Sequence, residues 1–182
     1  GGLDPARFGD DRTSYIQRQG RKAWNLKSWA KKDTMEVAGL AAGLIKSEGL
    51  QKLFIDVGGL GAGVVDRLRE MGLGDKIVAV NSGEKPLDNE KYYNKRAEMW
   101  GVMNDWLHDE PVEIPDSDEL HGDLVGVSYS YDSNTRLKLE KKEDMKKRGL
   151  RSPDTGDALA LTFAFPIMGE VKTPKANTGW VV

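Results

Sequence analysis

Asp56 has the most distinctive surroundings of any residue in the chain that could do chemistry. It ends the apolar run 53–55 and precedes the glycine-rich segment 58–63, after which apolar residues recur at helical spacing. This pattern predicts a strand, a tight turn and a helix, with Asp56 at the carboxyl end of the strand. Open α/β sheets bind their ligands at that edge. A buried carboxylate there needs a positively charged partner.

The glycine-rich segment fits neither of the common phosphate-binding motifs. A P-loop requires Lys and then Ser or Thr directly after its last glycine, whereas Val64 and Val65 follow Gly63. A dinucleotide-binding fingerprint has the spacing G-x-G-x-x-G, and Gly59, Gly61 and Gly63 are too closely spaced for it. We therefore interpret most of these glycines as positions where the helix packs closely on the strand. A Rossmann-like nucleotide-binding domain remains an alternative.

Two further aspartates are predicted to lie near Asp56. Asp4 is near the end of the first predicted strand, and Asp157 is in the first turns of the last predicted helix, among small and apolar residues. If the first and fourth strands are neighbours, Asp4 and Asp56 lie side by side, and the last helix can bring Asp157 to them. Three carboxylates this close cannot all be ionised without cations between them. Two divalent ions roughly 3.5 to 4 Å apart would satisfy them and would clamp the attacking and leaving oxygens of a phosphodiester.

Other acidic residues near these positions have simpler explanations. Asp154 lies in the first turn of the last predicted helix, where acids commonly face the positive end of the helix dipole. Asp10 and Asp11 are expected in a turn, from which they could assist the metal ions. Asp154 and Asp11 are therefore auxiliary candidates.

Composition limits the kind of site that these residues can build. The chain has 182 residues, of which 38% are hydrophobic and 31% charged, which is typical of one globular domain. It has no cysteine, which excludes disulfides, thiolate zinc sites and a cysteine nucleophile. Because the only histidines are His108 and His121, a metal site must consist mainly of carboxylates, which favour magnesium or manganese. No apolar stretch approaches the roughly 20 residues of a membrane span.

Charge is distributed unevenly along the chain although the net charge is only −2. Residues 105–123 include eight acids and no Lys or Arg, which we interpret as a solvated face. Residues 136–151 include eight basic residues against three acids, and the first 32 residues have the same excess. Two basic segments that flank an acidic site could follow a phosphate backbone. The residues predicted to hold such a backbone are Lys141, Lys142, Lys146, Lys147, Arg148 and Arg151.

The order of the predicted elements indicates an α/β domain with a mixed β-sheet. A strand at the start and a hairpin of 13–17 and 22–29 precede a helix that begins after Asp33 and ends at Gly49. The strand 53–56, the helix after it, the strand 77–80 and a long helix over about 89–108 follow. An acidic connection over 109–123 leads to a hairpin insertion over about 124–140, with strands 124–131 and 135–140. The last helix spans 154–165, so that the domain covers 1–168 and the tail 169–182 is loosely ordered.

Four segments together resemble the C-terminal nuclease domain of tailed-phage large terminase subunits, the DNA-packaging motor proteins. They are residues 2–11, 55–59, 89–100 and 146–159. The resemblance implies a ribonuclease H-like fold and two-metal cleavage of concatemeric viral DNA during genome packaging. It also implies a catalytic triad that maps onto Asp4, Asp56 and Asp157, in which Asp4 contacts both ions.

The resemblance further implies partners and a location. The partners are double-stranded DNA, the packaging ATPase domain of the same full-length protein, the portal and the small terminase subunit, and the location is the cytoplasm of the infected bacterial host. The sequence contains no Walker A motif, so the chain by itself is expected to cut DNA and not to translocate it. Our interpretation is a Mg²⁺- or Mn²⁺-dependent endodeoxyribonuclease domain. The alternative is a non-catalytic docking module of a packaging motor that binds the portal or partner subunits.

Overall fold

Five strands form a mixed β-sheet in the computed structural model, which describes residues 1–6 and 11–167. Their order in the sheet is β3-β2-β1-β4-β5. The strands are β1 (Gly2–Asp4), β2 (Thr13–Gln19), β3 (Lys22–Trp29), β4 (Leu53–Asp56) and β5 (Ile77–Val80). β2 is antiparallel to β1 and β3, whereas β4 is parallel to β1 and β5. The first and fourth strands are therefore neighbours, as predicted.

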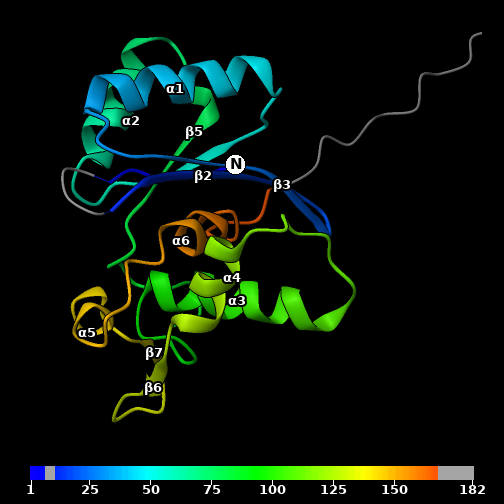
Figure 1. Ribbon diagram of the computed structural model, residues 1–182, viewed down its shortest axis with the longest axis vertical. Coiled ribbons are helices and arrows are strands. Elements are labelled where there is room, and N and C mark those ends of the chain that lie inside the picture. The colour runs from blue at the N-terminus through cyan, green and yellow to red at the C-terminus, as the bar shows by residue number, and fades with distance from the viewer. Residues whose placement is uncertain (7–10, 168–182) are drawn as a thin grey trace, which may run out of the picture.

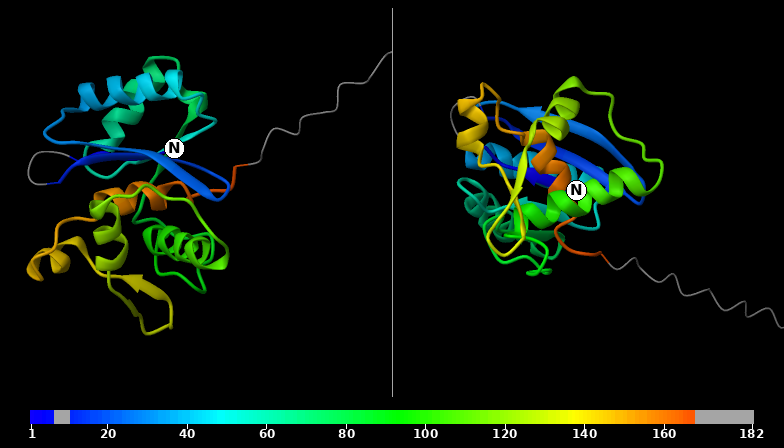
Figure 2. Two further views of the ribbon diagram at one scale, coloured as in Figure 1. Left: turned by 45° about the vertical axis from the view of Figure 1, so that its right-hand side comes forward. Right: turned by 90° about the horizontal axis from the view of Figure 1, so that it is seen from below.

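Helices cover both faces of this sheet (Figure 1). On one face lie α1 (Thr34–Ser47) and α2 (Gly61–Glu70). On the other face α6 (Asp154–Leu161) packs directly on the strands, and α3 (Lys95–Asp109) and α4 (Asp118–Gly126) lie beyond it. Figure 2 shows the same layers from two other sides. This arrangement confirms the predicted α/β fold with helices on both sides of a mixed sheet. In the described part of the chain no helix is long and apolar enough to cross a membrane.

The alternation of side chains along the strands decides which face the acidic residues occupy. Leu3 and Ile55 belong to the hydrophobic core under α1 and α2, whereas Phe54 belongs to the core under α6. Because successive strand residues point to opposite faces, Asp4 and Asp56 are directed to the α6 side. Leu3 is paired with Ile55, so the next residues along the two strands lie side by side at the carboxyl ends.

Close packing between α2 and the preceding strand explains one of the glycines. A Cβ atom on Gly61 would overlap with the backbone carbonyl oxygen of Asp56. Gly59 has a φ of +55°, which most other residues adopt only with strain. The interpretation of these glycines as positions where the helix packs closely on the strand is therefore confirmed for Gly61.

Two local signals placed α1 correctly. The side chain of Asp33 accepts a hydrogen bond from the amide of Glu36, and the Glu36 side chain accepts one from the amide of Asp33, which forms the predicted capping box. Gly49 follows the helix with a φ of +61°.

The long helix predicted over 89–108 begins later, at Lys95. The carboxylate of Asp88 accepts hydrogen bonds from the amides of the second and third residues after it, which folds this segment into a turn. The side chain of Asn94 then accepts a hydrogen bond from the amide of Ala97 at 2.9 Å and starts the helix.

The connection predicted over 109–123 contains most of a helix instead. Ser117 begins α4 by accepting a hydrogen bond from the amide of Leu120 at 3.3 Å. α4 continues to Gly126 and so occupies the first part of the predicted strand 124–131. The hairpin is shorter than predicted and consists of β6 (Tyr129–Tyr131) and β7 (Leu137–Leu139). Its turn over 132–134 is as predicted.

The remaining elements are two short helical segments and the last helix. A 3-10 turn, η1 (Gly74–Lys76), precedes β5, and α5 (Lys142–Lys147) lies in the basic segment. α6 ends at Leu161 and not at 165, because the amides of Thr162, Phe163 and Ala164 bond to the carbonyl oxygens three residues before them and not four. The tail predicted over 169–182 lies outside the described residues.

Candidate active site

Three elements bring the predicted aspartates to one edge of the sheet. Asp4 ends β1, Asp56 ends β4, and Asp157 lies in the first turns of α6. Asp4 and Asp157 are each only 7% exposed. The ammonium group of Lys142 lies 3.6 Å from Oδ2 of Asp4 and 2.9 Å from Oδ2 of Asp157, so these two carboxylates share one cation. The sequence predicted Lys142 as a DNA contact and not as a partner of these two aspartates.

Asp56 is held by the loop after the neighbouring strand. The hydroxyl of Ser82 donates a hydrogen bond to its Oδ2 at 2.8 Å, and the amide of Gly58 donates one to its Oδ1 at 2.9 Å. Ser82 follows β5, the strand paired with β4. These two contacts fix the carboxylate beside the end of β1.

Burial makes the charge of Asp4 unfavourable. Burial raises the pKa of Asp4 to about 8, and the nearby carboxylates of Asp157 and Asp56 add to this rise. Lys142 opposes the rise but does not cancel it. Lys142 itself has a raised pKa, because the charges of Asp4 and Asp157 outweigh the effect of its burial. The site therefore has more negative charge than this one lysine can compensate.

Asp157 is surrounded by donors that sequence reasoning missed. The guanidinium group of Arg96 donates to both of its oxygens, at 3.0 and 3.3 Å, and Nε1 of Trp100 donates to Oδ1 at 2.7 Å. Burial alone would raise the pKa of Asp157, but Arg96 and Lys142 outweigh it and lower the pKa to about 2. Arg96 and Trp100 are four residues apart on α3, a spacing that places them on one helix face and could have identified them as a pair.

The auxiliary candidate Asp154 lies near this cluster. Asp154 is 7% exposed, and its Oδ2 accepts a hydrogen bond from the amide of Arg12 at 2.7 Å. Burial raises the pKa of Asp154 to about 6. Its position in the first turn of α6 therefore does not fully describe this carboxylate, which is also buried. Asp11 forms an ion pair with Lys146 at 3.3 Å. Asp10 lies outside the described residues.

A carboxylate from α4 positions the helix that carries Asp157. The residue that precedes α6, Pro153, has no side-chain cap for the helix. Oδ2 of Asp123 instead accepts hydrogen bonds from the amide and hydroxyl of Thr155, at 2.9 and 2.5 Å, and from the amide of Gly156 at 3.1 Å. The interpretation of 105–123 as a solvated face is thus wrong for Asp123, because the helix within this segment turns the side chain toward α6.

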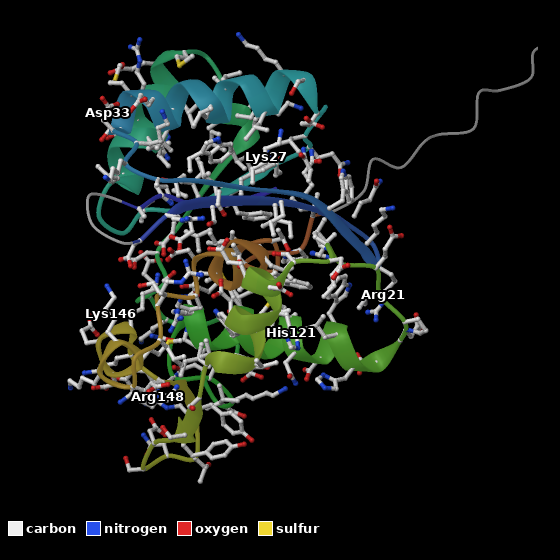
Figure 3. The ribbon with its side chains drawn as sticks, in the orientation of Figure 1. Arg21, Lys27, Asp33, His121, Lys146 and Arg148 are labelled. Atoms are coloured by element: carbon white, nitrogen blue, oxygen red, sulfur yellow. The ribbon has the colours of Figure 1, made fainter. Side chains whose placement is uncertain are left out.

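The predicted DNA-binding residues are distributed over α5 and its flanks. Lys142 contacts the acids, and Lys141 is exposed. The other members form ion pairs within the domain: Lys146 with Asp11, Lys147 with Asp144, Arg148 with Glu140, and Arg151 with Glu119. Figure 3 shows Lys146 and Arg148 on the same side of the molecule, with Arg21 at the opposite end. Arg21, one of the basic residues near the start of the chain, therefore does not form one surface with α5.

The donor set of the cluster suits a divalent cation. Its ligands are carboxylate oxygens, which magnesium and manganese prefer, and the cluster already binds a cation in the form of the Lys142 ammonium. As the side chains stand, no group of three or more acidic or histidine residues within 1–6 and 11–167 is close enough to hold a metal ion. Lys142 would therefore have to withdraw before Asp4 and Asp157 could share an ion.

Comparisons with known proteins identify the fold. No protein-family model and no curated protein sequence matches the chain. Among solved structures, the nuclease domain of the large terminase subunit gp2 of bacterial virus Sf6 matches with a TM-score of 0.76 and 23% identity. The match covers 92% of this chain and 90% of that chain. A mutant of the same viral domain with manganese has a TM-score of 0.74 and 23% identity, over 91% of this chain and 89% of that chain.

A second phage provides a more distant match. The large terminase nuclease from thermophilic phage G20c with bound magnesium has a TM-score of 0.68 and 12% identity, and the match covers 90% of this chain and 78% of that chain. At these identities the likeness establishes the fold. The chain has the ribonuclease H-like fold of phage large-terminase nuclease domains, as its sequence resemblance implied.

Proposed function

We propose that this chain is a Mg²⁺- or Mn²⁺-dependent DNA endonuclease domain that hydrolyses phosphodiester bonds. The observation that carries the proposal is that Asp4 and Asp56 end two adjacent parallel strands, while Asp157 from α6 shares the Lys142 ammonium with Asp4. Buried carboxylates at such a place are unfavourable for stability unless a cation binds there. A site of this kind fits metal-assisted hydrolysis.

Structural neighbours support the same reaction class. The matched domains of Sf6 and G20c are described as nucleases, and their structures include complexes with manganese, calcium, magnesium and cobalt. Ions that differ in size and preferred geometry share a preference for oxygen ligands, which is also the donor type in this chain.

In the proposed mechanism, Asp4 would contact two ions, one shared with Asp56 and the other with Asp157. When bound, the ions supply charge stabilisation for the attacking and leaving oxygens of the phosphodiester. Ser82 and the amide of Gly58 hold the Asp56 carboxylate in place. Arg96 and Trp100 fix the orientation of Asp157 and keep it ionised.

In this proposal the Lys142 side chain has one position without metal ions and another with them. In the ion-free site its ammonium compensates Asp4 and Asp157 and keeps the carboxylates together. If Asp4 and Asp157 held divalent ions, the Lys142 ammonium would be repelled, and its flexible side chain would have to leave the acids. Lys141, Lys146, Lys147, Arg148 and Arg151 would then contact the DNA backbone, which carries no sequence information by itself. Weak sequence preference is the expected result.

The sequence resemblance supports a proposal about the biological setting. We propose that the substrate is concatemeric viral double-stranded DNA and that cutting occurs during genome packaging in the cytoplasm of the infected bacterial host. The packaging ATPase domain of the same full-length protein, the portal and the small terminase subunit are the proposed partners.

Cleavage of a supercoiled plasmid tests the reaction class. The chain is incubated with magnesium, with manganese and with EDTA, beside Asp4→Asn, Asp56→Asn and Asp157→Asn. Asp66→Asn is a matched control, because Asp66 is an exposed aspartate on α2. We expect metal-dependent cutting by the wild type and the control and background cutting by the three variants. Intact plasmid with every metal, from chain shown to be folded, would contradict the proposal.

A further inference from the structure

A hollow between the β6–β7 hairpin and α5 lies directly beside the candidate active site. Its volume is about 340 Å³, and its walls include Ser128, Ser130, Lys138, Glu140 and Lys141. Lys141 precedes Lys142, which contacts Asp4 and Asp157. Lys141, in the wall of the hollow, is thus the neighbour in the chain of the residue that contacts these acids.

Arg96 joins the same two places from the opposite side. Its Nη1 donates a hydrogen bond to the carbonyl oxygen of Glu140 at 3.3 Å, and its Nε donates one to Asp157 at 3.0 Å. One guanidinium group therefore contacts both the wall of the hollow and the active-site carboxylate. The hollow is therefore within reach of a polymer chain bound at the acids.

The charges that line the hollow favour an anion. Its two acids are already compensated, since Glu140 binds Arg148 at 2.5 Å and Asp144 binds Lys147 at 2.7 Å. Among the described residues Lys138 forms no ion pair with a carboxylate, and its ammonium lies 5.0 Å from the centre of the Tyr93 ring. Lys141 is likewise exposed and forms no ion pair within the described residues.

We propose that this hollow is a subsite for the phosphodiester backbone of the DNA beside the scissile phosphate, with Lys138 and Lys141 as its charged contacts. Ser128 and Ser130 add hydroxyl groups, which are common donors to phosphate oxygens. The hairpin thereby becomes part of the DNA-binding surface. The proposal rests on the proposed nuclease function only in taking DNA as the substrate.

The salt dependence of DNA binding tests the subsite. Binding of a fluorescently labelled short duplex is measured by anisotropy in EDTA, at a series of salt concentrations, for the wild type and for Lys138→Gln/Lys141→Gln. Each lysine that contacts a phosphate contributes about 0.9 to the slope of log affinity against log salt, so the double variant should lose about 1.8. Lys138→Arg/Lys141→Arg should keep the slope of the wild type.

A lysine on the other side of the sheet provides the matched control. Lys46 is exposed on α1, which covers the opposite face, and Lys46→Gln should leave the slope unchanged. Circular dichroism verifies that each variant is folded. A slope in the double variant equal to that of the wild type would overturn the subsite, as would absence of DNA binding by the wild type.

Cleavage measured in parallel separates this proposal from the proposed function. If the wild type cuts plasmid with manganese and the double variant keeps the wild-type slope, the subsite is wrong and the nuclease function stands. If the slope falls as expected while no metal supports cutting by the wild type, the subsite stands and the nuclease function is wrong.

Discussion

Lys142 is the residue on which the state of the candidate active site depends. It is the cation nearest to both Asp4 and Asp157, and removing one charge from a buried group of opposite charges leaves the others uncompensated. The site as described thus holds a protein cation, which compensates part of its negative charge, in the place where the proposed function requires metal ions. Two consequences can be measured at single residues.

The first consequence concerns stability and pH. The pKa of Asp4 is about 8 in the folded chain, above its ordinary value of 3.8, so between these values the folded chain binds a proton that the unfolded chain releases. Its contribution to stability therefore falls as pH rises through this window. Asp4→Asn cannot ionise and should be more stable than the wild type by at least about 1 kcal/mol near pH 8 in EDTA.

Urea unfolding at several pH values measures this difference. The stability gained by Asp4→Asn should shrink as pH falls from about 8 toward about 4, because the carboxyl of the wild type is then protonated in both states. A variant that is less stable than the wild type near pH 8 would show that Asp4 is ionised and well paired in the folded chain.

The second consequence concerns competition between lysine and metal. Lys142→Ala removes the ammonium that divalent ions must displace, so the affinity for Mn²⁺ should increase by about tenfold or more. Isothermal titration calorimetry measures this affinity. Lys141→Ala, at the exposed neighbour, is the control and should change it little. Equal or weaker Mn²⁺ binding by Lys142→Ala would mean that Lys142 does not compete for the site.

At the scale of elements, α4 holds α6 in place through Asp123. Asp123→Ala leaves the amides of Thr155 and Gly156 without this acceptor and should lower the free energy of unfolding by about 1 to 2 kcal/mol. Asp123→Asn keeps one acceptor oxygen and should lose less. Urea denaturation compares both with Asp116→Ala, an exposed residue of the same acidic segment. Equal stability of the Asp123→Ala and Asp116→Ala variants would contradict the capping role.

The turn between β4 and α2 gives a paired test with opposite signs. Gly61→Ala places a Cβ against the carbonyl oxygen of Asp56 and should destabilise the fold by about 1 to 3 kcal/mol. Gly43→Ala, in α1, meets no atom within 4 Å and should stabilise the fold by roughly 0.5 to 1 kcal/mol. Thermal unfolding of both variants measures the signs. A neutral Gly61→Ala would show that α2 can move away from the strand.

Elements with strong local signals were predictable, and those that depend on competing signals were not. The capping box at Asp33 and the apolar run before Asp56 specify α1 and β4 without help from the rest of the chain. The sequence also contains Asn94 and Ser117, the caps of α3 and α4. The spacing of the aromatic residues before Asn94 and the acidic residues around Ser117 indicate other boundaries for these two helices. The hairpin was correct in its turn and too long in its strands, because α4 uses its first residues.

At the scale of the whole molecule, the sequence could indicate the acids but not their surroundings. Asp4, Asp56 and Asp157 stood out because acids beside apolar segments are unusual. The meeting of Asp4 and Asp56 required only that two strands be neighbours, and Asp157 required in addition that the last helix pack on them. The contacts of Arg96, Asp123 and Lys142 depend on how three helices pack around the sheet. No periodicity or local spacing specifies that packing, and for this reason Lys142 was predicted only as a DNA contact.

Binding of Mn²⁺ in crystals of the wild-type chain is the most direct test of the central claim, that these aspartates form a site for divalent ions. Anomalous scattering from crystals soaked in manganese locates the ions, and crystals soaked in EDTA are the control. The account predicts a peak in contact with Asp4 and at least one of Asp56 and Asp157, with the Lys142 ammonium moved away from both Asp4 and Asp157. A saturating soak that gives no peak at these carboxylates, with Lys142 still between Asp4 and Asp157, would contradict it.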